Sequence, residues 1–257
     1  MKGVVLAGGL GTRLHPMTRV TNKHLLPIYD RPMIYYPIQQ LVHAGVEDIL
    51  LVTGGESAGD FLRLLGNGSG FGLRHLNYTY QEGEGGIADA LGLARHFADD
   101  QPVAVILGDN VFENPVGPAI AAYESVGKGA MILLKEVDDP HRFGVARLDG
   151  DRIVEILEKP KDPPGPLAVT GCYIYDRHVY EIIDGLSPSE RGELEITDVN
   201  NRYLARGELM HHMLDGWWTD AGTIPSLFRA TSLVAASQDN PVLRQERPGA
   251  APSPPVA

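Results

Sequence analysis

Cysteine is almost absent from this sequence, since its 257 residues include only Cys172. A single cysteine excludes an internal disulfide framework and a cysteine-rich zinc site, and it fits a reducing compartment. Because apolar strand residues flank Cys172, we expect this thiol to be a packing residue.

Long apolar segments are also missing. Residues 1–30 contain no apolar signal-peptide core and no run of about 18 apolar residues that could cross a bilayer. These absences argue against export and membrane insertion. We therefore expect a cytoplasmic protein with no membrane partner.

Positive charge is scarce as well. The chain has 22 Lys and Arg against 33 Asp and Glu, which gives a formal net charge of −11. Such a balance argues against binding to nucleic acid, which needs clustered cations to neutralise phosphates. Any phosphate site must therefore be local, so cations near glycine-rich turns are the informative ones.

The first half of the chain does contain a regular alternation of strand and helix patterns. Apolar runs at 3–7, 46–54 and 102–110 alternate with helical stretches that include 33–45 and 85–98. This alternation predicts βαβ crossovers and an α/β fold, with a mainly parallel sheet flanked by helices. In such a sheet the ligand crevice lies beyond the carboxyl ends of the strands.

The pattern changes to a β-rich one after about residue 138. Segment 143–160 predicts two strands around a tight turn, and 168–176 predicts a further strand. We expect this β-rich insertion to lie over the crevice.

A glycine-rich loop, "AGGLGTR", follows the first strand. A dinucleotide fingerprint would need a third glycine where Leu14 stands, and a P-loop would need Lys after Gly11 rather than Thr12. The remaining interpretations are an ordinary strand-to-helix turn and a turn whose backbone N–H groups approach a nucleotide. In the second case Arg13 and Lys23 would supply charge to the phosphates.

The loop belongs to a longer set of segments that carries a family resemblance. "GGLGTRLHPMTRVTNKHLLPI" resembles the signature of sugar-1-phosphate nucleotidylyltransferases, and "YDRPMIYYPI" narrows this to glucose-1-phosphate thymidylyltransferases. Further matches follow in the family's order: "LGDN", "RFGV", "EKP", "AVTG", "RGELEITD" and "WWTDAGT". The resemblance covers about residues 1–235 and is to a short form, because longer members carry extra C-terminal helices.

The resemblance implies a reaction and the residues that drive it. The family's reaction would transfer a thymidylyl group from dTTP to α-D-glucose 1-phosphate, giving dTDP-glucose and pyrophosphate. This chemistry depends on positioning and charge neutralisation. By resemblance, Arg13 holds the leaving pyrophosphate, Lys23 neutralises the triphosphate, and Lys159 grips the sugar phosphate. Asp109 and Asp220 are the implied ligands of Mg²⁺, which prefers hard carboxylate oxygens.

The resemblance also implies which residues bind the substrates. Gln81 offers a donor and an acceptor to the imide edge of thymine or uracil. Gly85 replaces an acidic residue that many family members have, so contacts around Gly86 are expected to differ. The implied nucleotide contacts are Leu6, Gly8, Gly9, Gly11, Thr12, Arg13, Gln81, Gly86 and Asp109; the implied sugar-phosphate contacts are Asn110, Gly144, Glu158, Lys159, Val169, Tyr173 and Arg191.

The expected organisation is a single Rossmann-like nucleotidyltransferase domain over residues 1–238. Its parts would be a nucleotide-binding region (about 1–138), an inserted sugar-binding region (about 139–222) and a helix (about 223–238). Residues 239–257 are rich in Pro, Ala and Gly and predict a disordered tail. A homo-oligomer is expected.

Several alternatives stay open at this stage. Asp109 taken alone could be a helix N-cap and Asp220 a turn residue, and Trp218 could be a core residue. UTP could replace dTTP, because one methyl contact is worth only about 1 kcal/mol, and another hexose 1-phosphate could replace glucose 1-phosphate. From other classes, a non-catalytic nucleotide-sugar sensor would lack the charged residues, and Leu14 disfavours a nicotinamide-dependent oxidoreductase.

Overall fold

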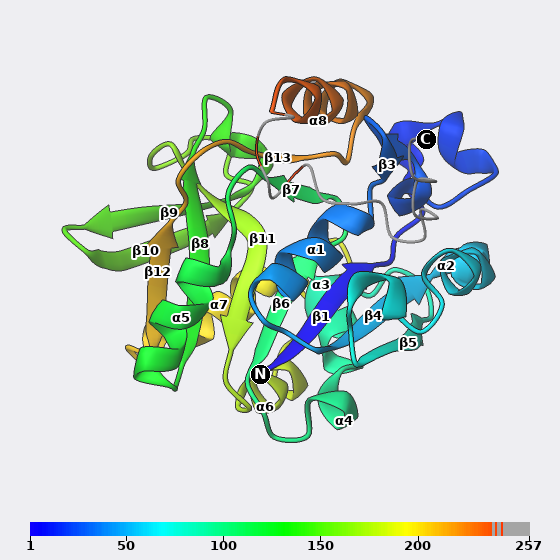
Figure 1. Cartoon of the computed structure of the whole chain (residues 1–257). Helices are drawn as coiled ribbons and strands as arrows, with labels where there is room; N and C mark the ends of the chain where they lie inside the picture. Colours follow the sequence, from blue (N-terminus) through cyan, green and yellow to red (C-terminus); the bar gives the residue numbers. More distant parts are fainter. Residues whose placement is uncertain (238–239, 241–242, 244–257) are drawn as a thin grey trace, which may run out of the picture.

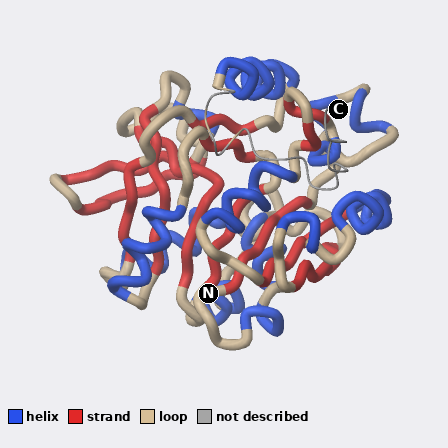
Figure 2. The backbone as a smooth tube through the Cα atoms, in the orientation of Figure 1, coloured by secondary structure: helices blue, strands red, loops and turns tan. Residues whose placement is uncertain are grey.

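The computed structural model describes residues 1–237, 240 and 243. Its centre is a nine-stranded sheet in the order β10-β9-β11-β6-β1-β4-β5, with β8 pairing β11 and β12 pairing β8. Helices lie on both sides of this sheet (Figure 1, Figure 2). The α/β fold is therefore confirmed.

One half of the sheet is parallel. Three of its strands, β1, β4 and β6, contain apolar runs that are buried along nearly their whole length, as expected when both faces are covered, whereas the edge strand β5 is partly exposed. In sheet order they are β6 (Val103–Leu107), β1 (Lys2–Ala7), β4 (Asp48–Gly54) and β5 (His75–Gln81).

The other half of the sheet is organised around one long strand, β11 (Leu167–Tyr175). It runs antiparallel to β6 on one side and to β8 and β9 on the other, so the β-rich insertion and the parallel half share one sheet. The buried Cys172 lies in β11, as expected for a packing residue. The remaining strands of this half are β8 (Ala130–Glu136), β9 (Gly144–Asp149), β10 (Arg152–Glu158) and β12 (Leu209–Met213).

The two faces of the sheet are covered by different sets of helices. Alternate strand residues enter two separate apolar clusters, because successive side chains of a strand point to opposite faces. One face packs against α1 (Tyr35–His43), α2 (Ala58–Leu65) and α5 (Gly117–Val126), and the other against α3 (Ile87–Gly92), α4 (Arg95–Ala98), α6 (Val179–Asp184) and α7 (Ile196–Ala205). None of the helices in the described part of the chain is both long and apolar enough to cross a membrane.

A third, smaller apolar cluster lies under the last helix, α8 (Ile224–Ala236). Figure 1 shows α8 beside a small antiparallel ladder of β7 (Asn110–Phe112) and β13 (Trp218–Asp220). A second two-stranded ladder, β2 (Pro27–Ile28) with β3 (Arg31–Pro32), contributes Ile28 to the same cluster.

Two residues of the segment expected to be a disordered tail, Asn240 and Leu243, are among the described residues. Leu243 is 2% exposed and belongs to the third cluster, together with Val111 and Ala230. Asn240 Nδ2 donates to the carbonyl of Glu113. A single apolar side chain can pack on the core without any apolar periodicity around it. The rest of the expected tail lies outside the described residues.

Candidate functional site

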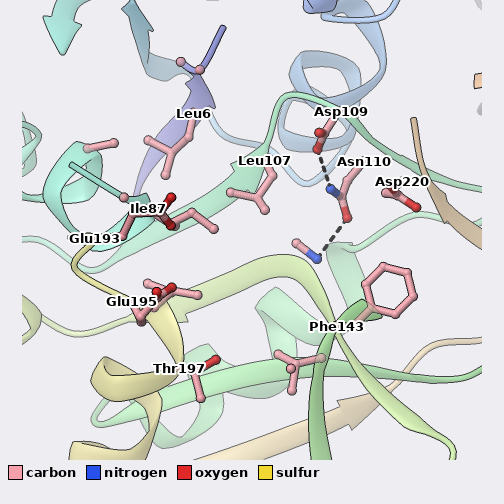
Figure 3. A pocket seen from close by; sticks show the side chains of 18 of the residues that line it. Leu6, Ile87, Leu107, Asp109, Asn110, Phe143, Glu193, Glu195, Thr197 and Asp220 are labelled. Carbon is pink, nitrogen blue, oxygen red and sulfur yellow. Dashed lines mark hydrogen bonds between the residues drawn. The ribbon is translucent and has the colours of Figure 1, made fainter. Parts of the chain in front are cut away.

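A cavity of about 320 Å³ opens at the carboxyl ends of the parallel strands. Leu6, Gln81 and Leu107, at or next to the ends of β1, β5 and β6, line one part of it. In Figure 3 Asp109 and Asn110 lie on one side of the cavity, and Glu195 and Thr197 lie on the other. The expected crevice is therefore present, and the β-rich insertion forms its opposite wall.

The glycine-rich loop leads into short 3-10 turns, η1 (Thr12–Leu14), η2 (Met17–Arg19) and η3 (Lys23–Leu25), rather than into an α-helix. Gly11 has φ of 64°, and a Cβ on it would lie 3.1 Å from Cβ of Lys23. The loop therefore folds back so that Arg13 and Lys23 line the same cavity.

Lys23 and Asp109 form an ion pair within the cavity. Lys23 Nζ donates to Asp109 Oδ2 over 2.6 Å. Burial, the largest single influence, would raise the pKa of Asp109, but the Lys23 ammonium and the hydrogen bonds from Lys23 and Asn110 act together against it, and this pKa lies below its ordinary range. Asp109 is therefore an anion at physiological pH.

Asp220 reaches the same place from the far end of the chain. In the β7–β13 ladder it lies opposite Asn110, the residue after Asp109. Its two carboxylate oxygens accept from Arg142 Nη2 at 3.2 and 3.3 Å. Oδ2 of Asp220 and Oδ2 of Asp109 lie 3.2 and 3.4 Å from the position that a Cβ of Gly222 would occupy. The two carboxylates thus face one common point.

This pair of carboxylates fits a magnesium ion. Hard anionic oxygens are what Mg²⁺ binds, and substrate phosphates commonly supply its other ligands. Among the described residues no group of three or more His, Cys, Asp or Glu side chains is arranged to hold a metal. The protein would therefore share the coordination of the ion with its substrate. Lys23 and Arg142 neutralise the two carboxylates in this structure.

Asn110 holds the elements around these carboxylates together. Its Nδ2 donates to Asp109 Oδ1 at 2.9 Å (Figure 3). Its Oδ1 accepts from the backbone N–H of Gly171 and from Nε1 of Trp218. Asn110 is 3% exposed, so it is locked by its partners. Trp218 is buried, as expected from the alternative interpretation that it is a core residue. It also lines the cavity, and its Nε1 fixes the side chain of Asn110.

The sequence-based view of Gln81 needs a correction. Gln81 was expected to present both a donor and an acceptor, but its Nε2 donates to Asp89 Oδ2 at 2.7 Å and to Gly86 O at 3.1 Å. Both amide hydrogens are thus engaged within the protein. Only Oε1 is left for the cavity.

The wall opposite the carboxylates contains five of the expected sugar-phosphate residues, Gly144, Glu158, Lys159, Val169 and Tyr173. Thr197 Oγ1 donates to Glu158 Oε2 at 2.6 Å, and Lys159 Nζ lies 3.2 Å from Glu158 Oε1. Lys159 has φ of 41°, which is uncommon for a residue with a side chain. Its backbone N–H donates to Phe143 O, which ties it to the start of β9. Gly144, Val169 and Tyr173 line the cavity beside them.

Three expected site residues do not line the cavity: Gly11, Thr12 and Arg191. Gly11 and Thr12 are at the start of the first 3-10 turn, where Gly11 packs against Lys23. Arg191 Nη2 donates to Glu195 Oε1 at 2.7 Å and to Glu158 Oε1 at 3.3 Å, so this exposed side chain is paired with carboxylates of the wall rather than lining the cavity.

Other lining residues were not singled out from the sequence. Arg142 and Phe143 lie in the quoted "RFGV" segment, and Glu195 and Thr197 in "RGELEITD", so the motifs contained a signal that single-residue reasoning did not use. His24 is fully enclosed. Burial, reinforced by Lys23, lowers its pKa to about 3, so it is a neutral part of the wall.

Comparison with known proteins places this geometry in a class. The chain belongs to the nucleotidyl transferase family, which it matches over residues 2–237. Within that family it is similar to glucose-1-phosphate thymidylyltransferases. The enzyme of that name from Neisseria meningitidis serogroup A is 43% identical over 93% of this chain and 84% of its own length, and that from Mycolicibacterium smegmatis is 44% identical over 91% and 82%.

A solved structure shares the fold closely. The crystal structure of a Bacillus anthracis protein in complex with sucrose, provisionally assigned as a glucose-1-phosphate thymidylyltransferase, is 50% identical, with a TM-score of 0.87 over 91% of this chain and 94% of that one.

Proposed function

We propose that this protein transfers a thymidylyl group from dTTP to α-D-glucose 1-phosphate, giving dTDP-glucose and pyrophosphate. One observation carries the proposal. A single cavity contains two carboxylates that face one point, Asp109 and Asp220, and it has cations on both of its walls. The relatives named glucose-1-phosphate thymidylyltransferase, at 43 and 44% identity, support this reaction over its uridylyl counterpart.

The residues of the first wall would bind and orient the triphosphate. Arg13 would hold the β- and γ-phosphates that leave as pyrophosphate, and Lys23 would neutralise charge near the α-phosphorus. When bound by Asp109 and Asp220, Mg²⁺ would supply a charge that stabilises the phosphate oxygens as they react. Lys23 is already 2.6 Å from Asp109, so the cation needed at the reacting phosphate is held next to the metal carboxylate.

The opposite wall would hold the sugar phosphate. Lys159 would contact its phosphate, and Glu158, fixed by Thr197, would accept hydrogen bonds from sugar hydroxyls. Asn110, Gly144, Val169 and Tyr173 would complete the sugar pocket, and Arg191 would act at its edge through Glu158. Such positioning supplies most of the catalysis of phosphoryl transfer.

The reaction is tested by measuring pyrophosphate release with Mg²⁺ across a matrix of dTTP, UTP and dCTP against several hexose 1-phosphates. We expect the highest kcat/KM for dTTP with glucose 1-phosphate, and no release after chelation of the metal. Equal release without a sugar 1-phosphate would mean that the protein is a hydrolase, and would overturn the proposal.

Some finer expectations belong to the same proposal and rest on the family. They are the cytoplasmic location, assembly as a homo-oligomer, and the division into a nucleotide-binding part (about 1–138) and a sugar-binding part (about 139–222). Strand β11 of the second part pairs with β6 and β8 of the first part and with β9 of the second. This continuous pairing supports a single domain.

A further inference from the structure

The side-chain amide of Gln81 is held in one orientation by two acceptors. Nε2 lies 2.7 Å from Asp89 Oδ2 and 3.1 Å from Gly86 O. A backbone carbonyl can only accept, and an ionised carboxylate likewise has no hydrogen to donate. Both contacts therefore require the nitrogen of the amide on this side. Gln81 is 6% exposed, so water does not replace these partners.

The opposite end of the amide is turned toward the cavity. Gln81 Oε1 lies 2.9 Å from the position that a Cβ of Gly8 would occupy, and both Gln81 and Gly8 line the cavity. Asp89 does not line it. The atom that Gln81 presents to a ligand is therefore the acceptor Oε1. Asp89, which lies behind the cavity wall, holds the amide in this orientation.

Gly85 leaves the space in which Asp89 can make this contact. A Cβ on Gly85 would lie 2.4 Å from Asp89 Oδ2 and 2.6 Å from its Cγ. Gly85 is not among the glycines with positive φ, so its backbone does not itself demand glycine. The requirement for a small residue at this position comes from the Asp89 carboxylate.

We infer that Asp89 is a positioning residue that sets the base selectivity of this site. It keeps Gln81 Oε1 toward the cavity, so the site favours a base whose ring nitrogen carries a hydrogen, as in the imide N3–H of thymine or uracil. Cytosine has an acceptor at N3 and would meet Gln81 Oε1 with a lone pair against a lone pair. This inference rests on the proposed function, because it assumes that the base lies against Gln81.

The direct test replaces Asp89 by residues of similar size. Asp89→Leu removes the acceptor, and the ratio of kcat/KM for dTTP to that for dCTP should fall about tenfold, the effect of about 1.4 kcal/mol. The change should arise in the KM of the nucleotide, with the KM of glucose 1-phosphate unaltered. Asp89→Asn retains an acceptor oxygen and should keep the wild-type ratio within about threefold. Glu124→Leu, an exposed change on α5, is the matched control.

A second variant displaces the carboxylate without changing it. Gly85→Ala should reduce the selectivity ratio as Asp89→Leu does, because the new methyl group occupies the place of Oδ2. In an Asp89→Ala background the same substitution should have no further effect on the ratio, since the obstructing carboxylate is gone. This non-additivity would not arise from a general loss of stability.

Binding measurements separate this inference from the proposed reaction. Calorimetry with dTDP and dCDP reports base discrimination without turnover. The inference holds if Asp89→Leu and Gly85→Ala each narrow the difference in Kd between the two ligands while Asp89→Asn does not. It is overturned if all three variants discriminate as the wild type does. Absence of pyrophosphate release by a wild type that still discriminates would overturn only the reaction.

Discussion

Asp220 lies directly opposite Asn110 in the antiparallel β7–β13 ladder, and this register brings its carboxylate to that of Asp109. The ladder is reinforced by Trp218, whose Nε1 donates to Asn110 Oδ1 at 2.7 Å, and by the backbone bond from Ala221 N to Asp109 O at 2.8 Å. Two residues far apart in the sequence are therefore fixed by main-chain geometry. Oδ2 of Asp220 and Oδ2 of Asp109 both lie within 3.4 Å of the position that a Cβ of Gly222 would occupy.

We predict that Asp109→Asn and Asp220→Asn each lower turnover at least about a hundredfold. Each change keeps the size of the side chain but removes one anionic ligand, and losses of this order follow removal of one electrostatic contact to a transition state. The two effects should be less than additive, because both act through one ion. Initial-rate measurements on the single and double variants over a range of Mg²⁺ concentrations check this.

The control for that series is Asp184→Asn, which removes a carboxylate from an exposed ion pair with Arg95. It should turn over normally. Near-normal turnover of either site variant at limiting Mg²⁺ would show that the carboxylates do not hold the ion.

We predict that Lys159→Ala impairs use of glucose 1-phosphate more than use of dTTP. Lys159 follows β10 on the wall opposite the glycine loop, and a hydrogen bond to a charged group is worth about 1.5–3 kcal/mol. The apparent KM for the sugar phosphate should therefore rise about ten- to a hundredfold. Steady-state kinetics with each substrate varied in turn measure this, with the exposed neighbour Lys161→Ala as control. Equal increases for both substrates would place Lys159 elsewhere in the reaction.

We predict that Asp48→Asn destabilises the protein without changing turnover. Asp48 joins the amino ends of three parallel strands, accepting from Lys2 Nζ at 2.8 Å, from Arg74 Nε at 3.0 Å and contacting His75 Nδ1 at 3.0 Å. Removing the charge should lower the free energy of unfolding by about 1–3 kcal/mol at pH 7. Urea denaturation measures this, and kcat is the control.

The destabilisation by Asp48→Asn should depend on pH in a defined direction. The hydrogen bond from Arg74 comes first among the causes that hold the pKa of Asp48 below its ordinary value of 3.8; Lys2 and His75 add to it, and burial opposes it. A carboxyl with a lowered pKa in the folded state stabilises that state above the unfolded pKa, and loses this effect as the pH falls further. The difference in the free energy of unfolding between wild type and Asp48→Asn should therefore shrink below about pH 4. A difference that stays constant down to pH 3 would show that it does not come from the charge of Asp48.

We predict that Leu243→Ala lowers the free energy of unfolding by about 2–5 kcal/mol, the usual cost of emptying a buried leucine site. Leu243 is 2% exposed against the cluster under α8, which includes Ala221 next to Asp220. Thermal and urea unfolding measure the effect. Phe228→Ala on the outer face of α8, where the ring is 74% exposed, should change stability by less than about 0.5 kcal/mol. Equal behaviour of the two variants would mean that Leu243 is not an anchor in solution.

The α/β fold and the edge of the sheet that holds the site could be predicted from the sequence. Strand and helix patterns are local, and a buried parallel strand ending in glycine or aspartate indicates which edge of the sheet holds the ligand. For this reason the sequence assigns Arg13, Lys23 and Asp109 to one crevice, and they line one cavity. The ordered family segments extended this assignment to Lys159 and Asp220.

How these groups face one another could not be predicted from the sequence. The orientation of Gln81 depends on Asp89, eight positions along the chain in a different element, and the exclusion of Arg191 from the cavity depends on Glu158 and Glu195. Leu243 is buried by contacts with distant residues that no local pattern predicts. Hydrogen-bond direction and burial are set by whichever groups meet in space, and a linear sequence records neighbours along the chain rather than neighbours across it.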